Sequence, residues 1–208
     1  MNRLRLVAAG GVLAVCAAGC HNPNRPAASA GNTPPAHGDV IQNPDRARAN
    51  TEQAYHLIEK EKYAQAEPIL KQAIELDPMY GPAHNDLGLV YFHLGRMYEA
   101  AWEFENAGTL MPKQPAPRNN LGLVLEESGE LKEAQAAFEK AVELAPDNPE
   151  YLGNLARARI RLGLEDAQTL HLLQELLLRD TRPDWLDWER ANLLRIRGVL
   201  ERPPTTAP

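Results

Sequence analysis

Cysteine is scarce in this sequence. The 208 residues include two, Cys16 and Cys20, and both lie close to the N-terminus. Removal of residues 1–19 as a secretion signal would leave one cysteine. A fold held together by disulfides within the chain is then excluded, even in an oxidising compartment.

Residue patterns that carry catalytic chemistry are also missing. The six histidines show no metal-ligand spacing such as H-x3-H or H-E-x-x-H. The sequence has no glycine-rich phosphate loop, no G-x-S-x-G elbow and no Cys–His pair. We interpret the carboxylates of Glu126, Glu127, Glu130 and Glu133 as a solvated helix end and turn. We therefore expect no enzyme activity, no metal, no cofactor and no small-molecule substrate.

Positive charge is in the minority. Lysine and arginine number 22 against 28 aspartates and glutamates, so the formal net charge is −6, and no basic cluster stands out. Such a chain is a poor candidate for binding nucleic acid or an anionic membrane surface through charge.

One uncharged apolar run occurs, over residues 6–18, behind Arg3 and Arg5. It is too short to span a bilayer comfortably, and its flanks are typical of a secretory signal. The small residues A-A-G before Cys20 resemble the lipobox of bacterial lipoproteins, which implies cleavage before Cys20 and diacylation of this residue. Plain secretion with cleavage nearby is the alternative. Because no Asp follows Cys20, the resemblance implies the outer membrane, facing the periplasm.

A unit of 34 residues is written twice between Gly81 and Pro146. A period of this length is typical of stacked helical solenoids. The apolar spacing predicts an antiparallel pair of helices in each unit, with a glycine ending the first helix. The first copy contains Leu87-Gly88, Tyr91, Gly95, Ala100, Phe104, Ala107 and Pro112; the second contains Leu121-Gly122, Leu125, Gly129, Ala134, Phe138, Ala141 and Pro146.

This pattern resembles the tetratricopeptide repeat family, L-G-x2-Y…A-x3-F…P. The resemblance implies that Gly88 lies where the two helices of its unit cross, and that Phe104 fills the space between successive units. The second copy has the same residue types at these positions. One departure is His84, with Arg118 in the second copy, where the family often has Trp.

The same frame extends in both directions. Residues 21–43 are rich in Pro, Ala, Asn, Gly and Ser and cannot bury enough apolar surface to offset the entropy of ordering. In the fourth unit, Gln168 and Glu175 stand where alanines are expected. We predict an all-α tetratricopeptide solenoid with this division: signal peptide 1–19, lipidated N-terminus and disordered linker 20–43, three clear repeats 44–80, 81–114 and 115–148, a divergent fourth repeat 149–182, a capping helix 183–200 and a tail 201–208.

The first helices of the repeats are expected to line a concave face. Asp86, Asn120 and Asn154 each precede the Leu-Gly position and resemble an asparagine ladder that clamps the backbone of an extended peptide, since an amide both donates and accepts. The alternative is that these amides hydrogen-bond only within the groove or to water. The predicted peptide-binding residues are Asn85, Asp86, Leu89, Asn119, Asn120, Leu123, Asn154 and Arg157.

Charged residues suggest a gradient along this face. The middle is expected to be negative because of Asp86, Glu126 and Glu127, and the fourth repeat positive because of Arg157, Arg159 and Arg161. A partner strand would then carry basic residues near the second and third repeats and acidic ones near the fourth. Trp188 falls at the ladder position of the last helix, as a buried capping residue or, alternatively, as an aromatic wall of the groove.

These observations together predict a membrane-tethered adaptor of the bacterial cell envelope that binds a protein or an extended peptide. Similar lipoproteins with such repeats suggest pilotin-like help in assembling pilus, secretion or outer-membrane machinery, or scaffolding of peptidoglycan enzymes. The alternative from another class is a self-assembling structural protein of the envelope.

Overall fold

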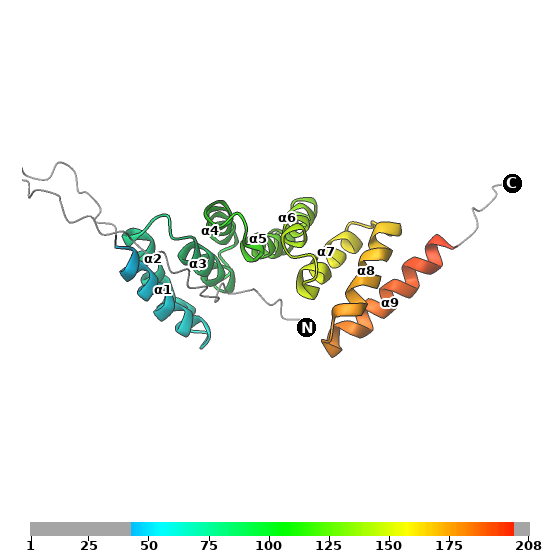
Figure 1. Ribbon diagram of the computed structural model, residues 1–208, viewed down its shortest axis with the longest axis horizontal. Helices are drawn as coiled ribbons and strands as arrows, with labels where there is room; N and C mark the ends of the chain where they lie inside the picture. Colours follow the sequence, from blue (N-terminus) through cyan, green and yellow to red (C-terminus); the bar gives the residue numbers. More distant parts are fainter. Residues whose placement is uncertain (1–42, 202–208) are drawn as a thin grey trace, which may run out of the picture.

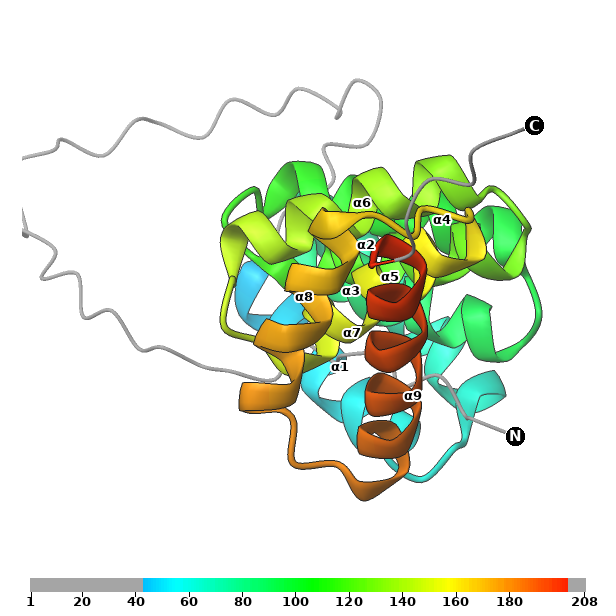
Figure 2. The ribbon, with the colours of Figure 1, turned by 90° about the vertical axis from the view of Figure 1, so that its right-hand side faces the viewer.

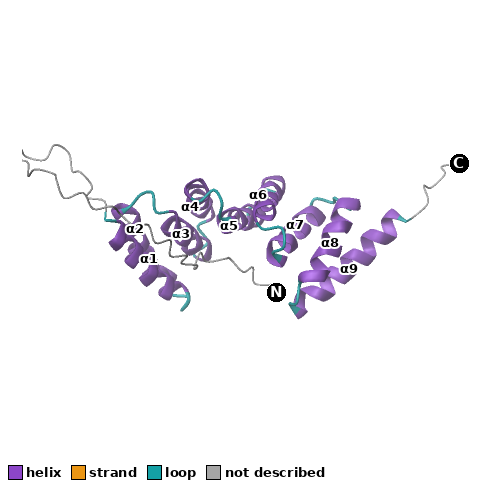
Figure 3. Cartoon of the chain, in the orientation of Figure 1, coloured by secondary structure: helices purple, strands orange, loops and turns teal. Residues whose placement is uncertain are grey.

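The computed structural model describes residues 43–201, which form helices and no strand (Figure 3). The all-α prediction is therefore confirmed. The predicted signal, the predicted lipidation site and most of the predicted linker and tail lie outside the described residues. The helices within 43–201 are α1 (Pro44–Ile58), α2 (Tyr63–Leu76), α3 (Gly81–His93), α4 (Met97–Leu110), α5 (Pro115–Glu127), α6 (Leu131–Leu144), α7 (Pro149–Arg161), α8 (Ala167–Arg179) and α9 (Pro183–Leu200).

The first helices of the pairs begin at a regular interval. Helices α3, α5, α7 and α9 start at residues 81, 115, 149 and 183, each 34 after the last. Each has a proline in its first turn, where the missing N–H is one that a helix leaves unpaired anyway. The capping helix α9 thus continues the series of first helices.

The turn inside each pair requires a left-handed backbone. Gly95, Gly129 and Gly163 have φ of +75°, +82° and +75°, and Glu61 takes the equivalent position in the first pair with φ of +56°. A Cβ on any of the three glycines would meet nothing within 4 Å. Backbone conformation, not space, therefore calls for glycine here.

The helix pairs stack side by side into an arch (Figure 1). Helices α1, α3 and α5 lie on its inner side, and α4 and α6 lie on its outer side. Seen along the long axis, α9 runs beside α8 at the C-terminal end (Figure 2). Within residues 43–201 no helix is both long and apolar enough to cross a bilayer.

In the two clearest repeats, a phenylalanine ring lies against a glycine of the same repeat. A Cβ on Gly88 would lie 2.8 Å from the ring of Phe104, and one on Gly122 would lie 2.6 Å from the ring of Phe138. Both rings are fully buried. Each ring thus occupies the space that the missing Cβ leaves in its own repeat, and it belongs to the same buried cluster as apolar residues of the next repeat, Leu121 and Val124 for Phe104 and Leu155 and Ala158 for Phe138.

The fourth pair departs from the frame by one residue. Its second helix buries Thr169, Leu173 and Leu176, each 35 residues after the equivalent Ala134, Phe138 and Ala141. The prediction that Gln168 and Glu175 replace the two alanines is therefore wrong. One extra residue in the turn between α7 and α8 shifts the register, and Thr169 and Leu176 take those positions.

The C-terminal helix covers the end of the solenoid. Leu193 and Ile196 of α9 form a buried cluster with Leu173 and Ala156, and Trp188 packs half-buried against it. On the opposite side of α8, Leu178 is 79% exposed. Helix α8 is therefore apolar on the side that α9 covers and partly apolar toward solvent.

Candidate peptide-binding face

The predicted binding residues come from α3, α5 and α7, the first helices of three consecutive pairs. Seven of them are buried, with exposed fractions between 0% and 4%: Asn85, Asp86, Leu89, Asn119, Asn120, Leu123 and Asn154. The eighth, Arg157, is half-buried. Buried polar groups almost always have hydrogen-bond partners, so the partners decide what this face can do.

The amides pair with one another across neighbouring repeats. Asn120 Nδ2 donates to Asn85 Oδ1 at 3.1 Å, and Asn154 Nδ2 donates to Asn119 Oδ1 at 2.7 Å. We call these four residues the Asn network. It ties α3 to α5 and α5 to α7, and so uses part of the hydrogen-bonding capacity that a peptide would need. Clamping of a peptide by these residues stays a prediction.

One donor of the Asn network is left over. Asn119 Nδ2 is buried and has no hydrogen-bond partner within residues 43–201. A buried donor without a partner costs about 1–3 kcal/mol, and an incoming carbonyl oxygen would remove this cost.

The network stops at the fourth repeat because of two residues. Gly153 stands where Asn85 and Asn119 stand in the earlier repeats, and Trp188 stands where Asn120 and Asn154 do. A Cβ on Gly153 would lie 3.6 Å from Trp185 and 3.5 Å from Arg182. Trp185 therefore lies close to Gly153, one residue before the ladder residue Asn154.

Asp86 lies beside the Asn network and is fully enclosed. Burial raises its pKa to about 7, against a hydrogen bond from Asn85 that lowers it. At neutral pH the carboxyl is thus partly protonated. Its contribution to a negative centre of the groove is smaller than the sequence suggested.

Glu126 is the clearest correction to the sequence analysis. We expected a solvated carboxylate, but the residue is 2% exposed. Arg157 Nη2 donates to one of its oxygens at 2.6 Å, and Arg161 Nη1 lies 3.0 Å from the other. The carboxylate of α5 is therefore neutralised by two guanidinium groups of α7. Glu126 therefore does not contribute a free negative charge to the charge gradient that we expected along the groove.

Aromatic stacking continues this cluster toward the cap. The guanidinium groups of Arg157 and Arg182 lie 5.5 Å and 4.8 Å from the ring centre of Trp185. Arg182 also pairs with Asp180 and donates to the carbonyl oxygen of Pro149 at 3.2 Å. Arg159, in contrast, points toward α8 and bonds Thr169 and Asp166. It is therefore not part of the groove charge.

A second charged link was missed from the sequence. His84 Nδ1 donates to Glu103 Oε2 at 2.7 Å, and His84 Nε2 donates to the carbonyl oxygen of Pro78 at 3.0 Å. Both partners accept, so both bonds exist together only when the imidazole is protonated. Burial lowers its pKa, but the hydrogen bonds and the charge of Glu103 outweigh this, and the pKa is raised above its usual value.

The departure from the family pattern at position 84 could have indicated a special role for His84, although it could not identify Glu103 and Pro78 as its partners.

Within residues 43–201 no group of three or more His, Cys, Asp or Glu side chains is placed to hold a metal ion.

Comparison with known proteins adds the family. Tetratricopeptide repeat models match residues 51–115 and residues 115–148. Comparison with curated proteins finds no significant match. Three solved structures illustrate the likeness in fold; all are 20–22% identical to this chain.

The first is Pseudomonas aeruginosa pilF, at a TM-score of 0.66, with 74% of this chain and 70% of that chain covered. The second is YrrB, a TPR protein with an unusual peptide-binding site, at a TM-score of 0.65, with 78% of this chain and 81% of that chain covered. The third is the first TPR domain of Spaghetti (RPAP3) bound to an HSP90 peptide, at a TM-score of 0.58, with 60% of this chain and 98% of that chain covered. The periodic sequence, the stacked helix pairs and the family matches agree: the chain is a tetratricopeptide repeat protein.

Proposed function

We propose that this protein is a membrane-tethered adaptor of the bacterial cell envelope that binds an extended segment of a partner protein along α3, α5 and α7. Its repeats support a protein-binding adaptor or scaffold. The lipid on Cys20 fixes the location, the linker sets the reach, and the inner face selects the partner. The protein adds no chemistry of its own.

One observation carries the proposal. Three consecutive first helices present side chains of matching type at matching places, and the strip they form keeps one amide donor, Asn119 Nδ2, without an acceptor. A strand backbone offers carbonyl oxygens at regular spacing. Because the four Asn residues are at most 4% exposed in the free chain, the strand would reach them by exchanging Asn–Asn bonds for bonds to its own backbone. Arg157 and Arg161 form the more accessible edge.

Similar structures support a peptide partner. One was solved with an HSP90 peptide, and another is described as having an unusual peptide-binding site. In the envelope, the partner would belong to pilus, secretion or outer-membrane assembly machinery, where the adaptor would act like a pilotin. The alternative partners are peptidoglycan enzymes, which the same inner face would hold together as a scaffold.

Affinity capture tests the role of the inner face. The full chain and the variant Asn119→Leu/Asn154→Leu serve as baits in envelope extract. Replacing both partners of one hydrogen bond by side chains of similar size leaves no buried polar atom unpaired, so the fold should persist. The matched control is Gln72→Leu/Gln174→Leu, which changes two exposed amides on α2 and α8. We expect partners to be lost with the first variant alone; their retention would refute binding through the Asn network.

The lipid anchor has its own test. Growth with radiolabelled palmitate should label the full chain and not the variant Cys20→Ser, and this variant should leave the membrane fraction. Labelling of Cys20→Ser, or membrane association that survives the change, would contradict lipidation at Cys20.

Self-assembly is the second candidate. Leu178 and Leu194, on α8 and α9, are 79% and 65% exposed at the C-terminal end. Sedimentation across a range of concentrations separates the two functions: a stable monomer favours the adaptor. An oligomer whose size increases with concentration, and which the substitution Leu178→Glu dissociates into monomers, would favour self-assembly.

A further inference from the structure

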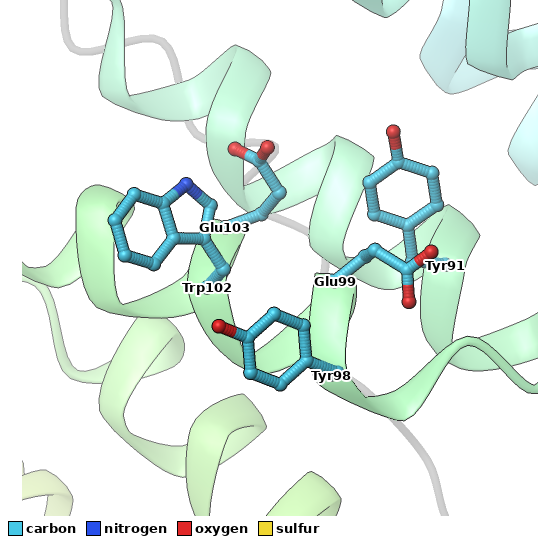
Figure 4. Close-up of a pocket in the computed structure, with 5 residues that line it drawn as sticks. All are labelled: Tyr91, Tyr98, Glu99, Trp102 and Glu103. Carbon is cyan, nitrogen blue, oxygen red and sulfur yellow. The ribbon is translucent and has the colours of Figure 1, made fainter.

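We propose that the outer side of α4 is a second binding site, which takes a lysine or arginine side chain of a partner protein. The site is a shallow pocket of about 290 Å³ lined by Tyr91, Tyr98, Glu99, Trp102 and Glu103 (Figure 4). It does not involve the Asn network. The proposal therefore stands independently of binding on the inner face.

Two aromatic rings are the main feature of this pocket. Tyr98 and Trp102 are four residues apart on α4 and therefore share one side of the helix. Tyr98 is 81% exposed and Trp102 is 57% exposed. Figure 4 shows these two rings and the Glu103 side chain around one open space, with the carboxylate of Glu99 at its edge beside Tyr91. Exposed Trp and Tyr side chains are the residues that most often dominate the energy of protein interfaces.

At the edge of the pocket, an aromatic ring and a carboxylate already hold a cationic side chain of the chain itself. The guanidinium of Arg96 lies 4.2 Å from the ring centre of Tyr91, and Arg96 Nε donates to Glu99 Oε1 at 2.8 Å. One ring and one carboxylate thus hold a cation from within the chain. Trp185 is used in the same way, with Arg182 over its ring and Asp180 beside it.

Tyr98 and Trp102 repeat this chemistry without an internal cation. Among residues 43–201, the cations that lie over aromatic rings belong to Tyr91 and Trp185. The face of an aromatic ring attracts a cation, and a nearby carboxylate strengthens the attraction. The open rings beside Glu103 are therefore complementary to a positively charged side chain.

The two carboxylates argue against other occupants. Arg96 bonds one oxygen of Glu99 and protonated His84 bonds one oxygen of Glu103, so the charge of each carboxylate is partly balanced within the chain. Their second oxygens can still accept a hydrogen bond from a basic side chain, and they have no hydrogen to donate to an acidic one. A purely apolar side chain would remove water from these carboxylates without replacing its hydrogen bonds, which is unfavourable. Glu103 keeps its position because one of its oxygens accepts the hydrogen bond from His84. A flexible basic side chain satisfies both the rings and the carboxylates.

The test uses nuclear magnetic resonance of the full chain labelled with ¹⁵N at tryptophan. The chain has three tryptophans, and the variant Trp102→Phe assigns the indole signal of Trp102. The probes are Nα-acetyl-arginine amide and Nα-acetyl-lysine amide, with the leucine and glutamate analogues for comparison. We expect the two cationic probes to shift the Trp102 signal saturably and to leave Trp185 and Trp188 unmoved.

Two variants make the result specific. Glu99→Gln removes a carboxylate that lines the pocket and should weaken binding of the cationic probes several-fold. Glu105→Gln changes an exposed carboxylate on the same helix outside the pocket and should leave binding unchanged. Equal weakening by both variants would reduce the effect to net charge and overturn the proposal.

Other occupants would give other outcomes. A Trp102 signal that responds as strongly to the leucine probe, or to none of the probes, would overturn the proposal. A shift produced by phosphatidylcholine vesicles in place of the cationic probes would assign the surface to lipid and overturn it as well.

Discussion

The second and third repeats differ from the fourth repeat and its cap in how neighbouring first helices are joined. Between α3 and α5, Asn120 and Asn85 form a neutral polar link. Between α7 and α9 arginines lie on Trp185, and Arg182 bonds the backbone of Pro149. The step from α5 to α7 has both kinds, because the Asn154–Asn119 bond and the Glu126–Arg157 pair occur together.

This difference shows that one repeat frame can be stacked by two kinds of interaction. Neutral amide bonds are insensitive to pH and to salt, whereas ion pairs are weakened by both. The Asn–Asn bonds of the middle repeats should therefore persist over a wide range of pH and salt concentration, whereas the pKa of the neighbouring Asp86 carboxyl, about 7, and the raised pKa of His84 make the groups beside them pH-dependent. The C-terminal end should depend on the protonation and pairing of a few charged side chains.

The largest expected effect comes from breaking the charged link at Glu126. Glu126→Ala leaves the half-buried guanidinium of Arg157 without its carboxylate, and we expect a loss of about 3–5 kcal/mol in the free energy of unfolding. The measurement is a urea titration. Glu143→Ala is the control, because this carboxylate pairs with Lys140 in solvent and should matter by less than about 0.5 kcal/mol. Similar small losses in both variants would contradict the burial of Glu126.

The next effect concerns the glycine that receives a phenylalanine ring. Gly122→Ala places a methyl group 2.6 Å from the ring of Phe138, and overpacking of this kind costs about 1–3 kcal/mol. The first repeat has Ala54 and Leu70 at the same two positions, both fully buried. We therefore expect Gly122→Ala/Phe138→Leu to be more stable than Gly122→Ala alone. A double variant that is less stable than the single one would refute this compensation.

A smaller, pH-dependent effect is expected at His84. The pKa of His84 is raised in the folded chain, so its contribution to stability is complete below the unfolded pKa of about 6.5 and is lost as the pH rises through the folded value. The stability difference between the full chain and His84→Gln should thus shrink from pH 5.5 to pH 8.5. Urea titrations at both values measure it. A difference that stays constant would mean that the imidazole is not charged.

The smallest effect is a gain. Glu61 holds the left-handed turn position that glycine holds in the other repeats. Glu61→Gly removes the steric cost of that backbone and should raise the free energy of unfolding by about 0.5–1 kcal/mol. Lys60→Gly, one residue earlier, is the control and should lower stability. A loss in both variants would show that the Glu61 side chain outweighs the strain.

Much of the fold could be predicted, because the 34-residue period indicates where the helices begin and which small residues are buried. Gly95 and Gly129 indicate turns, and the alanine and phenylalanine positions indicate which side of each second helix is buried. The fourth repeat escaped this reasoning. One residue added to a turn leaves no recognisable signal in the sequence. It nevertheless rotates α8, so that Thr169 and Leu176 occupy the buried positions that we assigned to Gln168 and Glu175.

The candidate site was less predictable for a physical reason. The Asn positions follow from the repeat, but each hydrogen bond joins residues 35 apart, and its existence depends on how closely neighbouring helices pack. A carboxylate such as Glu126, in a run of glutamates at a helix end, has the sequence pattern of a solvated residue. Only the approach of α7 brings Arg157 and Arg161 to it.

Photocrosslinking from the inner face tests the central claim most directly. A photoreactive amino acid replaces Arg161, at the accessible edge of the inner face, or Gln174, on the exposed side of α8. Irradiation of cells that carry the full chain should produce a covalent adduct with a partner protein from position 161 and none from position 174. Adducts from position 174 alone would contradict binding through the inner face of the repeats.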